Sequence, residues 1–135
     1  MGTIRATLRL SSSDVLSTTL DLPCAVDLSA DSGSIQRVKV LAVSAGVTAQ
    51  VIHKANEMLN SSYLYVKNLD TVKENYLYVY EEGPSDDPVI LKIGAGEFAF
   101  LPVDPTADLK AYGTKVDQLM EFGSFGLDSS AVRYS

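Results

Sequence analysis

The sequence predicts an all-β protein, built as an antiparallel β-sandwich of about nine or ten strands, with a jelly roll as the expected arrangement. Two observations support this prediction. Short apolar runs recur along the chain, and each of the four between Pro88 and Phe125 is closed by Gly, Pro or Asp before it reaches the length of an ordinary helix. Within many of these runs apolar and polar residues alternate, as they do in a strand with one buried face.

Length and composition indicate a single domain over residues 1–135. The chain is 46% hydrophobic and 21% charged, and no run approaches the ~18 apolar residues that would cross a membrane. The N-terminal residues lack the apolar core of a secretory signal, and they match a myristoylation site poorly.

Cys24 is the only cysteine, and we interpret it as a small buried apolar residue that is compatible with a reducing cytoplasm.

The charge of the chain argues against nucleic acid as a partner. The net charge is −6, and residues 68–135 hold five Lys/Arg against twelve Asp/Glu. Residues 1–67 hold six Lys/Arg against five Asp/Glu and contain no basic cluster. Because the acidic half would repel phosphate, we expect no nucleic-acid partner, and the lack of a long apolar run predicts no membrane partner.

Residues 1–22 predict an N-terminal β-hairpin. The segment Ile4–Leu10 alternates apolar and polar side chains, and Ser11–Asp14 forms the turn. Val15–Leu22 is the second strand, which Pro23 closes because proline cannot donate to a strand ladder. We expect this hairpin to attach the protein to other subunits through the apolar face of its first strand, which carries Ile4, Leu8 and Leu10.

The segments that follow predict a loop, a second hairpin and another loop. Cys24–Ser34 is rich in Ala, Asp, Ser and Gly, which is typical of a loop. Ile35–Ser44 and Val47–Lys54 form the hairpin, with the turn between them at Ala45-Gly46. Ala55–Ser62 is a loop, since it is too short to be stable as a helix by itself.

Two strands carry a stripe of tyrosines. Tyr63–Lys67 and Tyr76–Glu81 place tyrosine at alternate positions, so that leucine and valine occupy the opposite side of each strand. The stripe is either half-buried sheet packing or a face that binds a protein or a carbohydrate. The absence of tryptophan disfavours stacking on sugars. The residues of this candidate interface are Tyr63, Tyr65, Tyr76, Tyr78 and Tyr80.

The C-terminal half contains four short strands after an exposed acidic loop, Glu81–Pro88. Gly94-Ala95-Gly96 predicts a tight hairpin turn between the first two of these strands, and residues 127–135 predict a short polar tail. Glycine, proline or aspartate closes each strand: Val89–Ile93, Glu97–Val103, Leu109–Tyr112 and Gln118–Phe125.

No segment carries a catalytic or metal-binding signature. His53 is the only histidine, so one chain cannot assemble a centre of two histidines, and we interpret it as an ordinary surface or edge residue. The acidic loop lacks the D-x-D-x-D-G spacing of a calcium loop. Gly94-Ala95-Gly96 precedes a strand rather than a helix, unlike a phosphate-binding loop. We therefore expect no enzyme activity, no cofactor and no metal.

Four segments between Ser62 and Gly126 resemble small structural proteins of tailed bacteriophages, notably cyanophages and other marine phages. In those proteins a strand ends in Lys-Asn, a strand pair contains a Gly-Glu turn and ends in Leu-Pro, and two short strands close the pattern. The segments that match this order are Val66-Lys67-Asn68, Leu91–Pro102, Leu109–Gly113 and Met120–Phe125.

The proteins that this chain resembles are most like capsid decoration (cement) proteins. The resemblance implies a jelly-roll subunit, often a homotrimer, that binds the major capsid protein on the capsid exterior of the virion after synthesis in the host cytoplasm. It implies no activity and no cofactor. Related proteins are tail or tail-fibre components, so a carbohydrate- or receptor-binding β-sandwich is the alternative.

Overall fold

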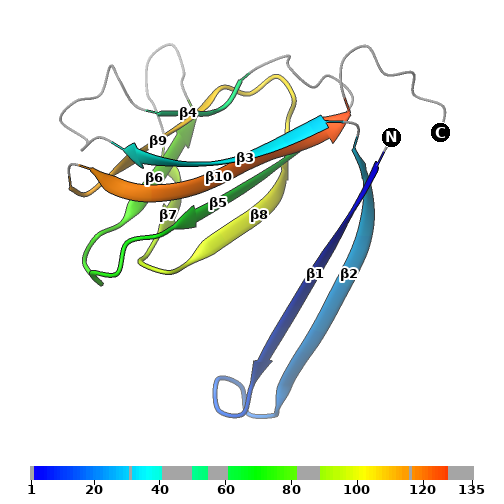
Figure 1. Ribbon diagram of the computed structural model, residues 1–135. Helices are drawn as coiled ribbons and strands as arrows, with labels where there is room; N and C mark the ends of the chain where they lie inside the picture. Colours follow the sequence, from blue (N-terminus) through cyan, green and yellow to red (C-terminus); the bar gives the residue numbers. More distant parts are fainter. Residues whose placement is uncertain are drawn as a thin grey trace.

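The structure is a computed structural model, and it describes residues 2–30, 32–40, 50–54, 61–81, 89–115 and 117–127. These residues form ten strands and no helix, which confirms the predicted all-β class (Figure 1). The described segments accordingly include no helix that could cross a membrane. The strands are β1 (Gly2–Ser12), β2 (Leu20–Ala30), β3 (Ser32–Val40), β4 (Gln50–His53), β5 (Ser61–Asn68), β6 (Leu77–Glu81), β7 (Val89–Ile93), β8 (Phe98–Val103), β9 (Leu109–Gly113) and β10 (Gln118–Leu127).

Strands β3 to β10 form the body of the molecule, which consists of two four-stranded antiparallel sheets. One sheet has the order β3-β10-β5-β8 and the other has the order β4-β9-β6-β7. Among consecutive strands of the described body, only β6 and β7 pair with each other. All the remaining connections lead from one sheet to the other. The body is therefore held together by pairing between strands that are far apart in sequence.

The core lies between the two sheets. Alternation turns Leu64 and Val66 of β5 toward the other sheet, from which Leu77 and Val79 of β6 face them, and all four are 0% exposed. Burying one large apolar side chain completely stabilises the fold by about 1.5–3 kcal/mol. The buried cluster is completed from the other strands by Val40, Ile52, Ile93, Leu109, Ala111, Met120 and Phe122.

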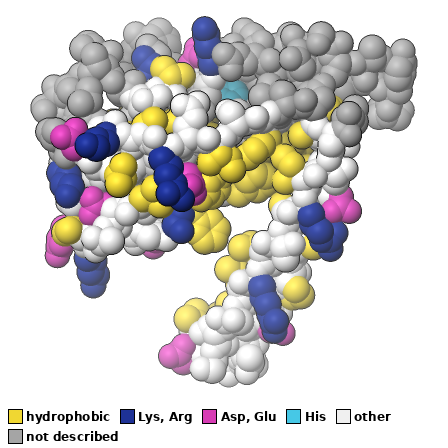
Figure 2. Space-filling view, viewed as in Figure 1, with side chains coloured by type: hydrophobic (Ala, Val, Ile, Leu, Met, Phe, Trp, Pro, Cys, Tyr) yellow, Lys and Arg dark blue, Asp and Glu magenta, His cyan; other side chains and the backbone are white. Residues whose placement is uncertain are grey.

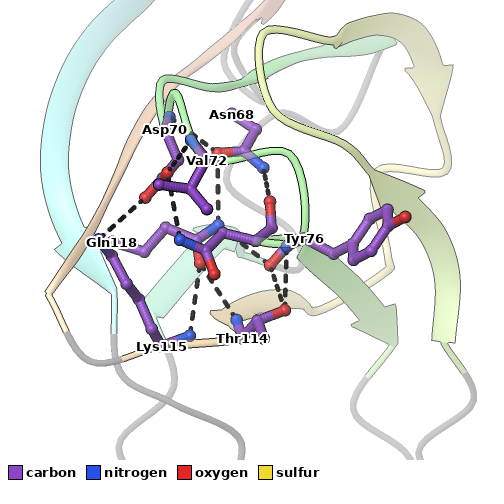
Figure 3. A network of polar contacts seen from close by, with 8 residues as sticks. Asn68, Asp70, Val72, Tyr76, Thr114, Lys115 and Gln118 are labelled. Carbon is purple, nitrogen blue, oxygen red and sulfur yellow. Dashed lines mark hydrogen bonds and ion pairs between the residues drawn. The ribbon is translucent and has the colours of Figure 1, made fainter.

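A buried polar network holds one end of the body together, where β5 ends and β10 begins (Figure 3). The Asn68 amide donates to the carbonyls of Asn75 and Ile93 at 2.9 and 3.0 Å. The Asn68 side-chain oxygen accepts from the Asp70 N–H at 3.0 Å and from the Gln118 amide at 3.3 Å. Both lone-pair directions and both amide protons of Asn68 are therefore used.

Gln118 extends this network to the neighbouring loops. Its amide also donates to the Tyr76 carbonyl at 3.0 Å, and its oxygen accepts from the Thr114 N–H at 3.1 Å (Figure 3). No buried side-chain nitrogen or oxygen in the described part of the chain lacks a hydrogen-bond partner. The network can therefore occupy a buried position without the penalty of an unsatisfied polar group.

Strands β1 and β2 form an arm that projects from the body as a separate two-stranded sheet (Figure 1). The pairing is regular from Gly2↔Ala30 at the base of the arm to Ser12↔Leu20 near its tip. The base adjoins β3, since β2 ends at Ala30 and β3 begins at Ser32. The predicted N-terminal hairpin is therefore present, and it is longer than residues 1–22.

The second strand of the hairpin differs from the predicted Val15–Leu22. Residues 13–18 belong to the bend at the tip, and β2 continues through Pro23, which lies opposite Arg9. Proline is tolerated there because each strand of a two-stranded sheet is an edge strand with one unpaired side. The loop predicted at Cys24–Ser34 is also wrong. Since Pro23 does not end the strand, the residues after it lie largely in β2 and β3.

Two predicted hairpin pairings are not found among the described residues, because the strands belong to different sheets. The segments Ile35–Ser44 and Val47–Lys54 overlap β3 and β4, which do not pair. Gly94-Ala95-Gly96 does form a turn, with the Glu97 N–H donating to the Gly94 carbonyl at 3.0 Å and Gly96 at φ 78°. That turn carries the chain from β7 to β8 in the other sheet. Both errors come from adjacent strands that cross the sandwich.

Some predicted segments lie outside the described residues. They are the turn at Ala45-Gly46, the loop residues 55–60, residues 82–88 of the acidic loop and residues 128–135 of the C-terminal tail.

Candidate functional site

The arm has one apolar face. Residues that lie opposite each other in an antiparallel pair share a face, and the register pairs Ile4 with Leu28, Ala6 with Val26, Leu8 with Cys24 and Leu10 with Leu22. Four of these side chains are about half exposed, with 46% exposure at Leu8, 44% at Leu10, 47% at Leu22 and 51% at Val26. We call these eight residues the arm face: Ile4, Ala6, Leu8, Leu10, Leu22, Cys24, Val26 and Leu28.

The opposite face of the arm is polar and carries ion pairs. Arg5 donates to the carboxylate of Asp27 at 2.9 Å, and Arg9 donates to that of Asp21 at 3.1 Å. All four side chains are exposed, so each pair contributes about 0–1 kcal/mol. The arm is thus amphipathic, with one face that suits water and one that does not.

The outer surface of the β3-β10-β5-β8 sheet is also apolar. Its register places Phe125 beside Tyr63 and Pro102, and places Tyr65 beside Phe100. The rings of Tyr63 and Phe100 are stacked, with centroids 6.1 Å apart and planes 10° apart. Together with two accessible side chains, Ile35 (59% exposed) and Phe98 (61% exposed), these residues form what we call the sheet face: Ile35, Tyr63, Tyr65, Phe98, Phe100, Pro102 and Phe125.

A glycine lets one ring of the sheet face lie flat. Gly33 pairs with Phe125 across β3 and β10, and a Cβ at Gly33 would collide with the Phe125 ring. The glycine therefore leaves the space that the ring fills.

A polar cluster borders the sheet face. Glu121 accepts from Arg37 at 2.8 Å and from the Tyr65 hydroxyl at 2.7 Å. The hydrogen bond from Arg37, followed by that from Tyr65, lowers the pKa of Glu121 below its ordinary value. Burial, together with the hydrogen bond to Glu121, raises the pKa of Tyr65 to about 12. The Tyr65 phenol is therefore neutral at physiological pH, and the carboxylate of Glu121 is ionised.

The arm face and the sheet face border the same groove, which has a volume of about 800 Å³ (Figure 2). One wall comes from β1 and β2, through residues that include Ile4, Leu8 and Val26. The other wall comes from the outer surface of the body, through residues that include Phe98 and Phe100. Figure 2 shows hydrophobic side chains gathered on the arm and on the side of the body next to it. Two apolar surfaces thus face each other without meeting.

The five tyrosines of the predicted stripe do not share one surface, since β5 and β6 lie in different sheets. Tyr63 and Tyr65 belong to the sheet face. Tyr78 lies on the other sheet, where its ring stacks on Tyr112 with centroids 5.2 Å apart. Tyr76 directly precedes β6, and its ring lies 6.3 Å from that of Tyr78. The alternation of tyrosine within each strand was predicted correctly. The interpretation of the five tyrosines as one surface was wrong.

This second tyrosine cluster has its own neighbours. The Lys92 ammonium lies 4.2 Å from the centroid of the Tyr76 ring, which is a cation–π contact. Tyr80 is buried, and its ring lies 5.7 Å from that of Tyr112. Tyr80 is therefore a packing residue rather than an accessible contact.

His53 is buried, which corrects the prediction of a surface residue, although its strand β4 is at the edge of its sheet. Its Nδ1 lies 2.8 Å from the Ala107 carbonyl, which can only accept, so Nδ1 donates. Its Nε2 lies 2.6 Å from the hydroxyl of Ser62, which donates to it. Ser62 is buried as well, so the pair connects β4 to β5 across the two sheets.

Two further predictions concern reactive and metal-binding groups. Cys24 is exposed on the arm face, so its interpretation as a buried residue is wrong. In the described segments no three residues among His, Cys, Asp and Glu are grouped so that they could hold a metal ion.

Sequence reasoning identified five of the fifteen residues of the two faces, namely Ile4, Leu8, Leu10, Tyr63 and Tyr65. Ile4, Leu8 and Leu10 lie on the arm face. Leu22, the partner of Leu10, was predicted in a strand, but Cys24 and Leu28, the partners of Leu8 and Ile4, were assigned to a loop. The residues of β8 that complete the sheet face were missed. Their alternate spacing as Phe98, Phe100 and Pro102 was the available signal, since it places all three on one side of a strand.

Comparisons with known proteins found no matching family model, no matching curated protein and no matching solved structure. The functional argument therefore depends on the residues of this chain.

Proposed function

We propose that the protein is a non-enzymatic structural subunit of a phage virion, which binds the major capsid protein and stabilises the capsid exterior. The observation that carries the proposal is the arm, whose apolar face is largely accessible in the single chain. A two-stranded hairpin is marginally stable in water without a second layer. The arm face therefore requires a covering surface, which an assembly of subunits would supply.

The strand order supports the jelly-roll interpretation. Eight strands in two four-stranded sheets, ordered β3-β10-β5-β8 and β4-β9-β6-β7, alternate between the sheets as expected for that fold. Jelly rolls occur in viral capsid proteins and also in lectins and cupins, so the fold alone does not decide the function. The resemblance of Ser62–Gly126 to phage structural proteins favours the first of these classes.

A trimer would make attachment effective with weak individual contacts. Three linked subunits present three attachment points to the capsid, and linked contacts raise the overall affinity without any new interaction. We propose this arrangement on the virion exterior, where the acidic charge of the chain keeps it away from packaged DNA.

Removal of the arm tests the proposal. We expect a variant that lacks residues 2–29 to unfold cooperatively, because the core residues all lie in β3 to β10, and to lose cosedimentation with undecorated phage heads. The matched control is Arg5→Gln with Asp27→Asn, which changes only the polar face of the arm and should bind normally. Normal occupancy of heads by the armless variant would refute the attachment role.

A carbohydrate- or receptor-binding tail component is the second candidate, and the cluster of Tyr76, Tyr78 and Tyr112 beside Lys92 favours it. Accessible aromatic rings near a cation can contact a sugar and its polar groups. Specific glycan-array binding that is lost in Tyr78→Ala and retained in the armless variant would support this function. Absence of binding to any glycan would reject it.

A further inference from the structure

We propose that copies of this chain exchange arms, so that the arm face of one copy packs on the sheet face of a neighbouring copy. This inference rests on the proposed function, since it identifies how the subunits associate. It starts from the groove, in which two apolar surfaces of one chain face each other across about 800 Å³.

The connection between β2 and β3 explains why one chain cannot close this groove. Two packed sheets lie about 10 Å apart. For the arm to pack flat on its own sheet, the chain would have to reverse direction and rise by that distance between Ala30 and Ser32. Ser32 is only two residues beyond Ala30, and two residues span at most about 7 Å, which is less than that distance.

Both ends of this connection are held in the body. The Ala30 side chain is buried, and β3 pairs with β10 from Ser32↔Gly126 onward. The arm consequently leaves the body where β3 begins, and it diverges from the sheet (Figure 1). A short connection that prevents an element from packing within its own chain favours packing on another copy.

The two faces are chemically matched. Both faces as defined are apolar. Lys67 lies beside Phe98 on the same side of the sheet, and Arg5 is among the residues that line the groove, so charged groups border the contact. The ion pairs Arg5–Asp27 and Arg9–Asp21 would remain on the outward side of the arm. The Arg37–Glu121 pair lies on the border of the sheet face.

The area of the contact suits a stable oligomer. Strands of 11 residues make the arm about 36 Å long and about 10 Å wide, so one face covers about 350 Å². A copy that gives one arm and receives another would bury about 700 Å² of its own surface, close to the ~800 Å² per partner of standard interfaces. In a closed ring such as a trimer, each copy also buries about 700 Å², but this area is divided between two interfaces of about 350 Å² per partner, so the area matches the standard interface only for a pair.

The native cysteine provides a direct test of exchange. The arm-thiol protein is the wild type, whose only cysteine is Cys24 on the arm face. The sheet-thiol protein carries Cys24→Ser with either Phe98→Cys or Ile35→Cys, so its only thiol is on the sheet face. The two proteins are given tags of different size, coexpressed and oxidised mildly. The control protein carries Cys24→Ser with Val51→Cys, an exposed position on the other sheet.

We expect a mixed disulfide between the arm-thiol and sheet-thiol proteins that is at least tenfold more abundant than the mixed disulfide with the control protein. A product no more abundant than the control product, for both sheet-thiol variants, would overturn the proposal. So would a protein carrying Cys24 and Phe98→Cys together that closes its disulfide within one copy.

Light scattering provides an independent measurement. Leu8→Asp places a charge on the arm face, whereas Thr3→Asp places the same charge on the polar face, at an exposed position that does not line the groove. We expect Leu8→Asp to weaken self-association at least tenfold and Thr3→Asp to leave it unchanged. Equal oligomerisation of the two variants, or a monomeric wild type at high concentration, would overturn arm exchange.

These outcomes are separable from failure of the proposed function. An exchanged oligomer that does not bind phage heads would reject capsid decoration and retain arm exchange. If the protein binds phage heads and Leu8→Asp does not weaken self-association, capsid decoration is retained and arm exchange is rejected.

Discussion

The arm and the body use the same strand pattern and differ in what covers it. In the body, the apolar side of each sheet is buried against the other sheet, so Leu64 and Leu77 are inaccessible. In the arm, the equally regular alternation of β1 leaves Leu8 and Leu10 accessible. The difference shows that alternation specifies a strand with an apolar side, whereas a second layer decides whether that side is core or contact surface.

The comparison predicts the largest effects in the body. We expect Leu64→Ala to lower the free energy of unfolding by about 4 kcal/mol, because it removes buried methyl groups and leaves a cavity. In the monomer, at concentrations below those of self-association, the matched substitution Leu8→Ala removes a half-exposed side chain and should cost about 1 kcal/mol or less. Urea unfolding monitored by circular dichroism measures both. Equal losses would mean that the arm belongs to the same cooperative core as the body.

The polar network should give the next largest effect. We expect Asn68→Ala to lower the free energy of unfolding by about 3 kcal/mol, since the Asn75 and Ile93 carbonyls, the Asp70 N–H and one proton of the Gln118 amide would each lose their hydrogen bond to Asn68. Asn75→Ala is the control, because its side chain makes a weaker contact with Asp70 at 3.2 Å. If Asn68→Ala proved as mild as Asn75→Ala, water would be replacing the lost bonds.

The border of the sheet face should give a smaller, pH-dependent effect. The pKa of Glu121 is lowered in the folded protein, so the folded state favours the ionised carboxylate. That stabilisation is fully present above the ordinary pKa of 4.5 and is lost as the pH falls below it toward the folded pKa. We expect the melting temperature to fall with acid more steeply in the wild type than in Glu121→Gln. Parallel curves would contradict this role.

The smallest effect should come from the polar face of the arm. Arg5 and Asp27 are both exposed in their ion pair, and we expect Arg5→Gln to change the free energy of unfolding by less than about 0.5 kcal/mol. Thermal unfolding at low and at high salt measures this change. A loss above about 1 kcal/mol would show that the arm is coupled to the body more tightly than its exposure indicates.

Pairing was the part of the fold that local patterns could not predict. The strands Val89–Ile93 and Gln118–Phe125 were located to within a few residues of β7 and β10. Neighbouring strands, however, were paired with each other, whereas β3 pairs with β10 and β5 pairs with β8. A turn such as Gly94–Gly96 has the same local composition whether the next strand stays in its sheet or crosses to the other.

The prediction of the candidate site was incomplete because strand pairing could not be predicted. The alternate spacing of Ile4, Leu8 and Leu10 predicts an apolar strand face. The spacing of Tyr63 and Tyr65 in β5 predicts that these two side chains share a face. Phe125 joins Tyr63 only because β10 lies beside β5. The sheet face therefore consists of residues that are distant in the chain.

The sequence by itself determined that this protein is all-β, where most of its strands lie and which side of each strand is apolar, because strand geometry converts alternation directly into faces. The tertiary structure decided which faces are buried. It placed Pro23 within an edge strand, divided the tyrosines between two sheets and directed the arm face toward the sheet face without contact. Burial depends on long-range pairing and on the reach of a one-residue connection, and neither is encoded in the pattern of any single strand.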